Sequence, residues 1–198
     1  MTVGAPGAAP VRVRLLDAAQ AMIEASGWSS VTMSGVAAGA GVSRQTVYNE
    51  FGTKHGLASH LAMRELERFL DVVRERMQGE TEIIAGLRSA CEGVLHMGER
   101  SLLVRTIVGS LPDEHDIDFL RILTTESGEI VEGSVAVVKQ NVVELYPPTP
   151  LTDAELEVMV ELAVRLVLSA ITRPSKAPAA AADEIAWVVG LALKGAGG

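Results

Sequence analysis

Three consecutive side chains near the start of this chain carry groups that can identify DNA bases. Arginine can hydrogen-bond guanine through two atoms, glutamine can do the same with adenine, and a threonine methyl can contact thymine. Arg44, Gln45 and Thr46 supply these groups in order. Polar residues around them suit phosphate contacts, which fix position rather than sequence. The side chains that we expect at double-stranded DNA are Thr32, Ser43, Arg44, Gln45, Thr46, Tyr48, Asn49 and Lys54.

Two short helices joined by a tight turn would present these side chains on one surface. Thr32 and Ser43 can cap the N-termini of the two helices, because their hydroxyls accept hydrogen bonds from free backbone amides. Gly41 lies between the helices and tolerates the positive φ that a tight turn requires. The amides at the start of the second helix can then face phosphate. The pattern predicts a helix-turn-helix whose second helix enters the major groove.

The stretch "TMSGVAAGAGVSRQTVYNEFGTKHGL", from Thr32 to Leu57, resembles the DNA-binding signature of the TetR family of transcriptional regulators. The motif resemblance extends over about residues 11–58, and the rest of the chain agrees with the family in length and helical character. The matching positions are Thr32, Val36, Ala37, Ala40, Gly41, Val42, Ser43, Tyr48, Phe51, Lys54 and Leu57.

The resemblance implies a homodimer with two helix-turn-helix heads. It also implies a larger C-terminal domain with a ligand cavity, and a dimer interface made by the last two helices. Ligand binding would change the spacing of the heads and release a palindromic operator, as in a repressor. Two such heads must lie about one DNA turn (~34 Å) apart to bind the two half-sites.

Three residues in this stretch depart from the family pattern. Glu50 would repel the DNA backbone unless it pairs with a neighbour such as His55 or Lys54. Gly35 and Gly39 replace better helix formers, each at about 0.5–1 kcal/mol relative to alanine. The two glycines predict a loose recognition unit that dimerisation or DNA binding tightens.

Apolar residues recur at steps of three and four along nearly the whole chain, which is typical of amphipathic helices. We predict an all-α protein of about nine helices, with a flexible leader at 1–10, a helix-turn-helix DNA-binding domain at 11–58 and a ligand-binding and dimerisation domain at 59–198. The segment 119–146 reads as one helix interrupted near Gly128 or Gly133, after an acidic connector at 113–118. A valine-rich run at 135–138 is the one candidate for a short strand.

Charge is divided unevenly along the chain, whose formal net charge is −8. Residues 1–60 carry a net charge of +1, so the remaining residues carry −9. This concentrates favourable potential for DNA at one end of an acidic protein. The chain has one cysteine, Cys91, which excludes an intramolecular disulfide and a cysteine-rich zinc site. Without an apolar run of about 18 residues or a signal-peptide pattern, a cytoplasmic protein is expected.

The residues for an effector cavity and a dimer interface follow from the apolar faces of the later helices. An aromatic content of 4% argues for an aliphatic effector over a planar one. The cavity candidates are Met63, Leu66, Leu70, Leu87, Cys91, Leu95, Leu103, Ile107, Phe119, Leu123 and Ile130. The candidates for a homodimer seam are Leu156, Met159, Val160, Ala163, Val167, Ile171, Trp187 and Leu191.

Catalysis is not expected, because we find no nucleophile elbow, phosphate-binding loop or supported carboxylate pair. No cofactor is expected, and the four histidines are not at metal-ligand spacing. Two alternatives stay open beside the ligand-responsive regulator. The helix-turn-helix could be a structural corner in a helical module that binds a protein partner, or Cys91 could make a DNA-binding regulator sensitive to oxidation.

Overall fold

The computed structural model describes residues 9–109, 121–122 and 127–196, and across these ranges the chain is helical with no strand. Nine α-helices and one 3₁₀-helix, η1, account for the described fold, which confirms the predicted all-α class. In chain order they are α1 (Val11–Ser26), η1 (Trp28–Ser30), α2 (Met33–Ala40), α3 (Arg44–Phe51), α4 (Lys54–Gln78), α5 (Ile83–Arg100), α6 (Leu102–Gly109), α8 (Gly128–Leu145), α9 (Asp153–Thr172) and α10 (Pro178–Ala196).

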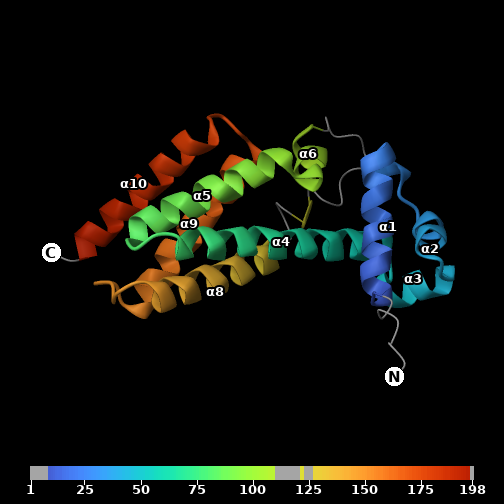
Figure 1. The fold of residues 1–198 in the computed structure, drawn as a ribbon, viewed down its shortest axis with the longest axis horizontal. Helices are drawn as coiled ribbons and strands as arrows, with labels where there is room; N and C mark the ends of the chain where they lie inside the picture. Colours follow the sequence, from blue (N-terminus) through green and yellow to red (C-terminus); the bar gives the residue numbers. More distant parts are fainter. Residues whose placement is uncertain (1–8, 110–120, 123–126, 197–198) are drawn as a thin grey trace, which may run out of the picture.

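The helices form a small head and a longer body joined by α4 (Figure 1). α1, α2 and α3 cluster at one end of the molecule, where α1 lies across the start of α4. α4 then runs the length of the body beside α5 and α8, and α5 also packs against α9 and α10. One continuous helix therefore belongs both to the head and to the body.

Side-chain caps and glycines set the helix boundaries in the head, as predicted for Thr32, Ser43 and Gly41. The hydroxyls of Thr32, Ser43 and Thr53 each accept a hydrogen bond from the backbone N–H three residues ahead. Gly41 ends α2 with a φ of +66°, and Gly27 and Gly52 also have positive φ at helix ends. In the body, α9 begins with a capping box formed by Thr152 and Glu155. Burial of the apolar faces then selects helix over the other conformations of the same segments.

The structure differs in detail from the predicted interrupted helix over residues 119–146. α8 begins at Gly128 and continues through Gly133 without a break. The valine-rich run at 135–138 lies within α8, because its side chains alternate between core and surface at helical rather than strand spacing. The predicted acidic connector at 113–118 lies outside the described residues.

The close approach of α1 accounts for the two glycines of α2, and the loose recognition unit stays a prediction. A Cβ at Gly39 would come within 3.1 Å of the Cβ of Ala18, and a Cβ at Gly35 within 2.7 Å of the Cε of Met22. The missing side chains allow the two helices to pack tightly over a core that includes the fully buried Trp28. The helix-propensity cost at these positions is therefore offset by packing.

The body has its own core, built where α4, α5, α8 and α9 meet. Tyr146 is buried there, and its hydroxyl donates a 2.8 Å hydrogen bond to the carbonyl of Met77 at the end of α4. A Cβ at Gly86 would lie 1.8 Å from that hydroxyl oxygen. Burial of the ring and the proximity of Glu80 raise the pKa of Tyr146, so it stays a phenol and a donor at neutral pH.

Candidate nucleic-acid interface and effector cavity

The second helix of the helix-turn-helix, α3, is fixed to the head by its buried side. Val47 is fully buried and Phe51 nearly so, and both belong to the head core. The turn before α3 is closed by a 3.0 Å hydrogen bond from the N–H of Val42 to the carbonyl of Ala37. This anchoring leaves the opposite side of α3 at the surface of the molecule.

The exposed side of α3 carries four of the predicted DNA-contacting residues in two adjacent rows. Arg44 lies over Tyr48, with its guanidinium carbon 5.7 Å from the ring centroid and Nη2 donating to the phenol oxygen at 3.4 Å. In the next row, the amide of Gln45 donates to Asn49 Oδ1 at 2.8 Å. These contacts at i and i+4 restrain long polar side chains that point away from the protein. The arrangement presents donors and acceptors along one exposed helix.

The N-terminus of α3 is organised by two hydroxyls. Ser43 Oγ accepts a hydrogen bond from the N–H of Thr46 at 3.1 Å, and the two side-chain oxygens lie 2.9 Å apart. Ser43 is exposed, whereas Thr46 is half-buried. The remaining backbone N–H groups at this end have the partial positive charge that favours phosphate.

Two predicted contact residues also hold the head together. The ammonium of Lys54 donates to the carbonyl of Trp28 at 3.0 Å and lies 4.7 Å from the centroid of its ring. Thr32 caps α2 through the N–H of Gly35. Each therefore has a structural task within the protein, and the phosphate-contact role of both stays a prediction.

Glu50 has a partner that the sequence did not suggest. Its carboxylate accepts from Arg12 Nε at 2.9 Å, and the pairing with His55 or Lys54 stays a prediction. The two side chains are 38 positions apart in sequence, and they meet because the first turn of α1 lies beside the end of α3 (Figure 1). The ion pair offsets the negative charge that Glu50 would otherwise bring to the DNA side.

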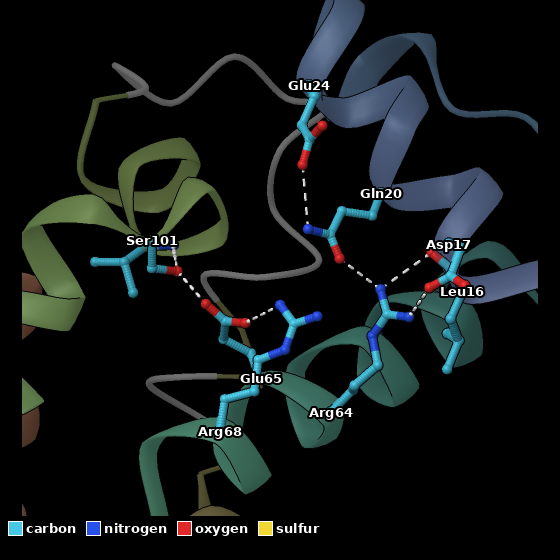
Figure 2. Close-up of polar contacts among 9 residues, drawn as sticks. Leu16, Asp17, Gln20, Glu24, Arg64, Glu65, Arg68 and Ser101 are labelled. Atoms are coloured by element: carbon cyan, nitrogen blue, oxygen red, sulfur yellow. Dashed lines mark hydrogen bonds and ion pairs between the residues drawn. The ribbon is translucent and has the colours of Figure 1, made fainter. Parts of the chain in front are cut away.

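A polar network that sequence reasoning missed joins the head to α4 (Figure 2). Arg64 on α4 donates to Asp17 Oδ1 at 2.7 Å, to Gln20 Oε1 at 2.6 Å and to the carbonyl of Leu16 at 3.2 Å. Gln20 in turn donates to Glu24 further along α1. The Arg64 side chain is mostly buried, so its charge is held by acceptors from α1 rather than by water.

The next residue on α4 forms a second polar contact, with the corner between α5 and α6 (Figure 2). Glu65 accepts from Ser101 Oγ at 2.6 Å and from Arg68 at 3.2 Å. Ser101 also accepts from the N–H of Val104, at the start of α6. Charged residues at consecutive helix positions usually read as a solvated face, so the sequence carried no signal for either contact. Their burial depends on how α1 and α6 pack on α4.

An apolar cavity of about 140 Å³ lies in the body between α4, α5, α6, α8 and α9. Six of the predicted cavity residues line it: Leu66, Leu70, Leu87, Cys91, Leu103 and Ile130. Met63 is exposed at the surface instead, and Leu95 faces a separate surface groove. Nothing is described of the Ile107 side chain, and Phe119 and Leu123 lie outside the described residues.

The residues predicted for the dimer seam divide into three groups. Leu156, Met159 and Val160 are buried in the core of their own chain, and Ala163, Val167 and Ile171 line the cavity. Trp187 and Leu191 on α10 are exposed. The sequence pattern identified the apolar stripe of α9 but could not tell which side faces the body. Exposed apolar residues that the prediction omitted are Val158, Leu162, Leu166 and Val188.

Burial determines the chemistry of the single cysteine. Cys91 is almost fully buried beside the cavity, and desolvation raises the pKa of its thiol to about 12. It is therefore a neutral thiol near pH 7. His96 lies on the same helix but contacts Glu92 and Glu99 instead, at 3.9 and 3.5 Å. Within the described ranges, no three potential ligands come together as a metal site, and no helix is long and apolar enough to cross a membrane.

Two family models together match most of the chain. The model described as "Bacterial regulatory proteins, tetR family" matches residues 15–61, and "Bacterial Tetracyclin repressor, C-terminal domain" matches residues 82–190. The HTH-type transcriptional regulator AlkX of Mycobacterium tuberculosis (strain ATCC 25618 / H37Rv) is 31% identical over 184 residues, which cover 90% of this chain and 83% of the relative.

Solved structures with the same fold include two repressors. The crystal structure of the TetR family repressor AlkX from Dietzia sp. strain DQ12-45-1b, implicated in biodegradation of n-alkanes, matches with a TM-score of 0.76 and 28% identity. The match covers 96% of this chain and 98% of that one. The transcriptional repressor QsdR of R. erythropolis has a TM-score of 0.62 at 18% identity, covering 93% and 94% of the two chains, and shows the shared fold.

Proposed function

Because this chain belongs to the TetR family of ligand-responsive, DNA-binding transcriptional repressors, we propose that it acts as a homodimer that binds a palindromic operator. The observation that carries this proposal is the exposed side of α3, where Arg44, Gln45, Tyr48 and Asn49 project from a buried anchor. An exposed helix with polar side chains near its N-terminus fits the major groove, which is wide enough to admit it.

We assign the predicted DNA-contacting residues to two tasks. Arg44, Gln45 and Thr46 contact base edges, and the other predicted residues position the head on phosphates. The residues given the second task are Thr32, Ser43, Tyr48, Asn49 and Lys54. The head extends over residues 11–58 and the body over residues 59–198, with the boundary inside α4.

Two exposed apolar rows support dimerisation through the last helices. Val158, Leu162 and Leu166 repeat every four residues on α9, while α10 exposes Trp187, Val188 and Leu191. Large apolar side chains gathered on adjacent elements usually mark an interface. A side chain already buried within one chain has little surface left for a partner, so Leu156, Met159 and Val160 are not in the proposed seam.

The apolar lining of the body cavity supports an aliphatic effector. Branched and aliphatic side chains provide nearly all of the lining that the structure describes. The AlkX relative from Dietzia is implicated in n-alkane biodegradation, which agrees with an effector carrying a saturated chain. Such a ligand would favour one spacing of the two heads over another, and would weaken operator binding by its differential affinity for the two states.

The experiment that tests this function is selection of genomic DNA fragments by the purified full-length protein at ~150 mM salt, near physiological ionic strength. Enrichment of one palindromic motif is the expected result. Binding should weaken steeply with added salt, since each phosphate contact releases counterions. A folded protein that enriches no motif would instead indicate the alternative, a helical corner that contacts a protein partner.

A further inference from the structure

Two kinds of contact attach the head to α4. Near the start of α4, Leu57, Ala58 and Leu61 are buried in one apolar core with residues of α1 that include Leu15 and Leu16. Burial of apolar surface stabilises this attachment, but it is non-directional because it depends on the area removed from water. Hydrogen bonds depend on angle as well as distance. The apolar core therefore joins α1 to α4 but constrains the angle between them less strictly than hydrogen bonds do.

Arg64 supplies directional contacts just beyond that core (Figure 2). Its Nη1 donates to Asp17 Oδ1 at 2.7 Å, and its Nη2 donates to Gln20 Oε1 at 2.6 Å and to the carbonyl of Leu16 at 3.2 Å. The acceptors follow one another along one side of α1. Because the guanidinium is planar and its donors form a rigid fork, these three hydrogen bonds restrain how α1 crosses α4.

The surroundings of Arg64 distinguish it from an ordinary surface arginine of the same helix. The Arg64 side chain is 18% exposed, and its acceptors lie 44 to 48 positions away in sequence. Arg74 is 47% exposed and pairs with Asp71, three residues earlier on α4. An exposed pair within one helix contributes little and cannot orient another element. A change in the angle of α1, by contrast, would leave a mostly buried charge with fewer acceptors.

We propose that Arg64 is a positioning residue that sets the angle of each DNA-binding head on α4, and through that angle the half-site spacing that the protein accepts. This inference rests on the proposed homodimeric regulator and names a residue that determines its operator specificity. One additional base pair moves a half-site by about 3.4 Å along the DNA axis and by about 35° around it. Heads held at a fixed angle would reject that change, whereas heads free to rotate would follow it.

The test measures the spacing preference directly. The palindromic motif that the unmodified full-length protein selects is remade with spacers one or two base pairs shorter or longer, and the affinity for each duplex is measured by fluorescence anisotropy. We expect the unmodified protein to prefer the selected spacer at least about tenfold over spacers that differ by one base pair. Arg64→Met keeps an unbranched apolar side chain and removes every donor. This variant should lose most of the preference, with unchanged affinity for a duplex that carries a single half-site.

Three further variants separate orientation of the head from a general effect of charge. Arg74→Met removes an arginine whose ion pair, with Asp71, lies within α4, and it should keep the full spacing preference. Arg64→Lys should restore part of the preference, because an ammonium can bind Asp17 but has no planar fork. Replacing both Asp17 and Gln20 by alanine removes two of the three acceptors and should broaden the spacing as Arg64→Met does. That double variant also decides the question if Arg64→Met does not fold.

The outcomes distinguish this inference from the proposed function. An unchanged spacing preference in folded Arg64→Met, or an equal loss in Arg74→Met, would overturn the inference and leave the regulator intact. Loss of single-half-site binding together with the spacing preference would assign Arg64 to folding of the head, and would also overturn the inference. An unmodified protein that selects no motif would reject the proposed function, and this inference with it.

Discussion

Arg44 combines exposure with a fixed direction, which suits a side chain that must identify a base. It lies over the ring of Tyr48 and is held by no residue of the head core. Arg44→Ala should weaken binding to the selected operator by about 1–3 kcal/mol and relax preference at one position. Measuring affinities for the operator and for single-base variants checks this. An equal loss on every sequence would instead assign Arg44 to phosphate.

Lys54 has two tasks that one substitution can separate. Its ammonium contacts both the carbonyl and the ring of Trp28, so Lys54→Ala should destabilise the DNA-free protein by about 1–2 kcal/mol. Thermal unfolding without DNA measures that loss, with the exposed Arg44→Ala as the control that should unfold like the unmodified protein. If Lys54 also contacts phosphate, the variant should bind DNA with a shallower dependence on salt. An unchanged slope would leave it a purely structural residue.

Cys91 should be chemically quiet in the folded protein. Burial raises the pKa of its thiol to about 12, whereas the pKa of an exposed cysteine is about 8.5. The unfolded chain therefore loses this proton first, and the stability that Cys91 contributes is complete below about pH 8.5 and is lost as pH rises toward 12. Alkylation at pH 8 should be slow in the folded state and fast in denaturant. Rapid native alkylation, or oxidant-dependent DNA release abolished by Cys91→Ser, would support the redox alternative.

The contact between α1 and α2 should make alanine substitution at two glycines of α2 differ in its effect on stability. At Gly39 an added Cβ would meet the Cβ of Ala18, which moves only with its backbone, so Gly39→Ala should destabilise the head although alanine favours helix. At Gly35 the nearest atom is the flexible end of Met22, which can move aside. Gly35→Ala should therefore be close to neutral. Denaturant unfolding of the pair measures the difference, and a Gly39→Ala protein as stable as the unmodified one would contradict the tight contact.

Helix boundaries were predictable because local chemistry determines them. Caps such as Ser43 and turn glycines such as Gly41 act within three or four residues, and both are present as predicted. Contacts between distant segments were not predictable in this way. The pairing of Arg12 with Glu50 and the approach of Ala18 to Gly39 depend on how helices cross, which spacing along one chain does not specify.

The functional surfaces were predictable to different degrees for a similar reason. The residues of α3 have one buried and one exposed side, so their type and register sufficed to place them at the surface. The stripe on α9 is broad, and its two sides differ little in composition. Only packing against the body separates buried Leu156 from exposed Leu162.

At the scale of the whole molecule, the proposed dimer predicts that self-association depends on the exposed apolar side chains of α9 and α10 and not on those of other helices. Leu162→Asp would place a charge within the proposed seam and should shift the protein toward monomers, with operator binding lost in parallel. Val143→Asp on α8 is the matched control, because Val143 is about as exposed as Leu162. This variant should stay dimeric. Sedimentation measures both. Dissociation by both substitutions, or by neither, would move the seam away from α9 and α10.

Because α4 belongs to both the head and the body, its length determines how far a small tilt at the cavity displaces the head. α4 contains no proline, and about 24 Å separate Val73 at the cavity from Leu57 in the head at the usual rise per residue. A lever of that length turns a tilt of about 5° at the cavity into a displacement of about 2 Å at the head. In a two-headed protein the displacements add, and their sum exceeds the spacing of one base pair (about 3.4 Å). Angular precision in the body, more than the strength of any one contact, would then decide whether both heads fit the same stretch of DNA.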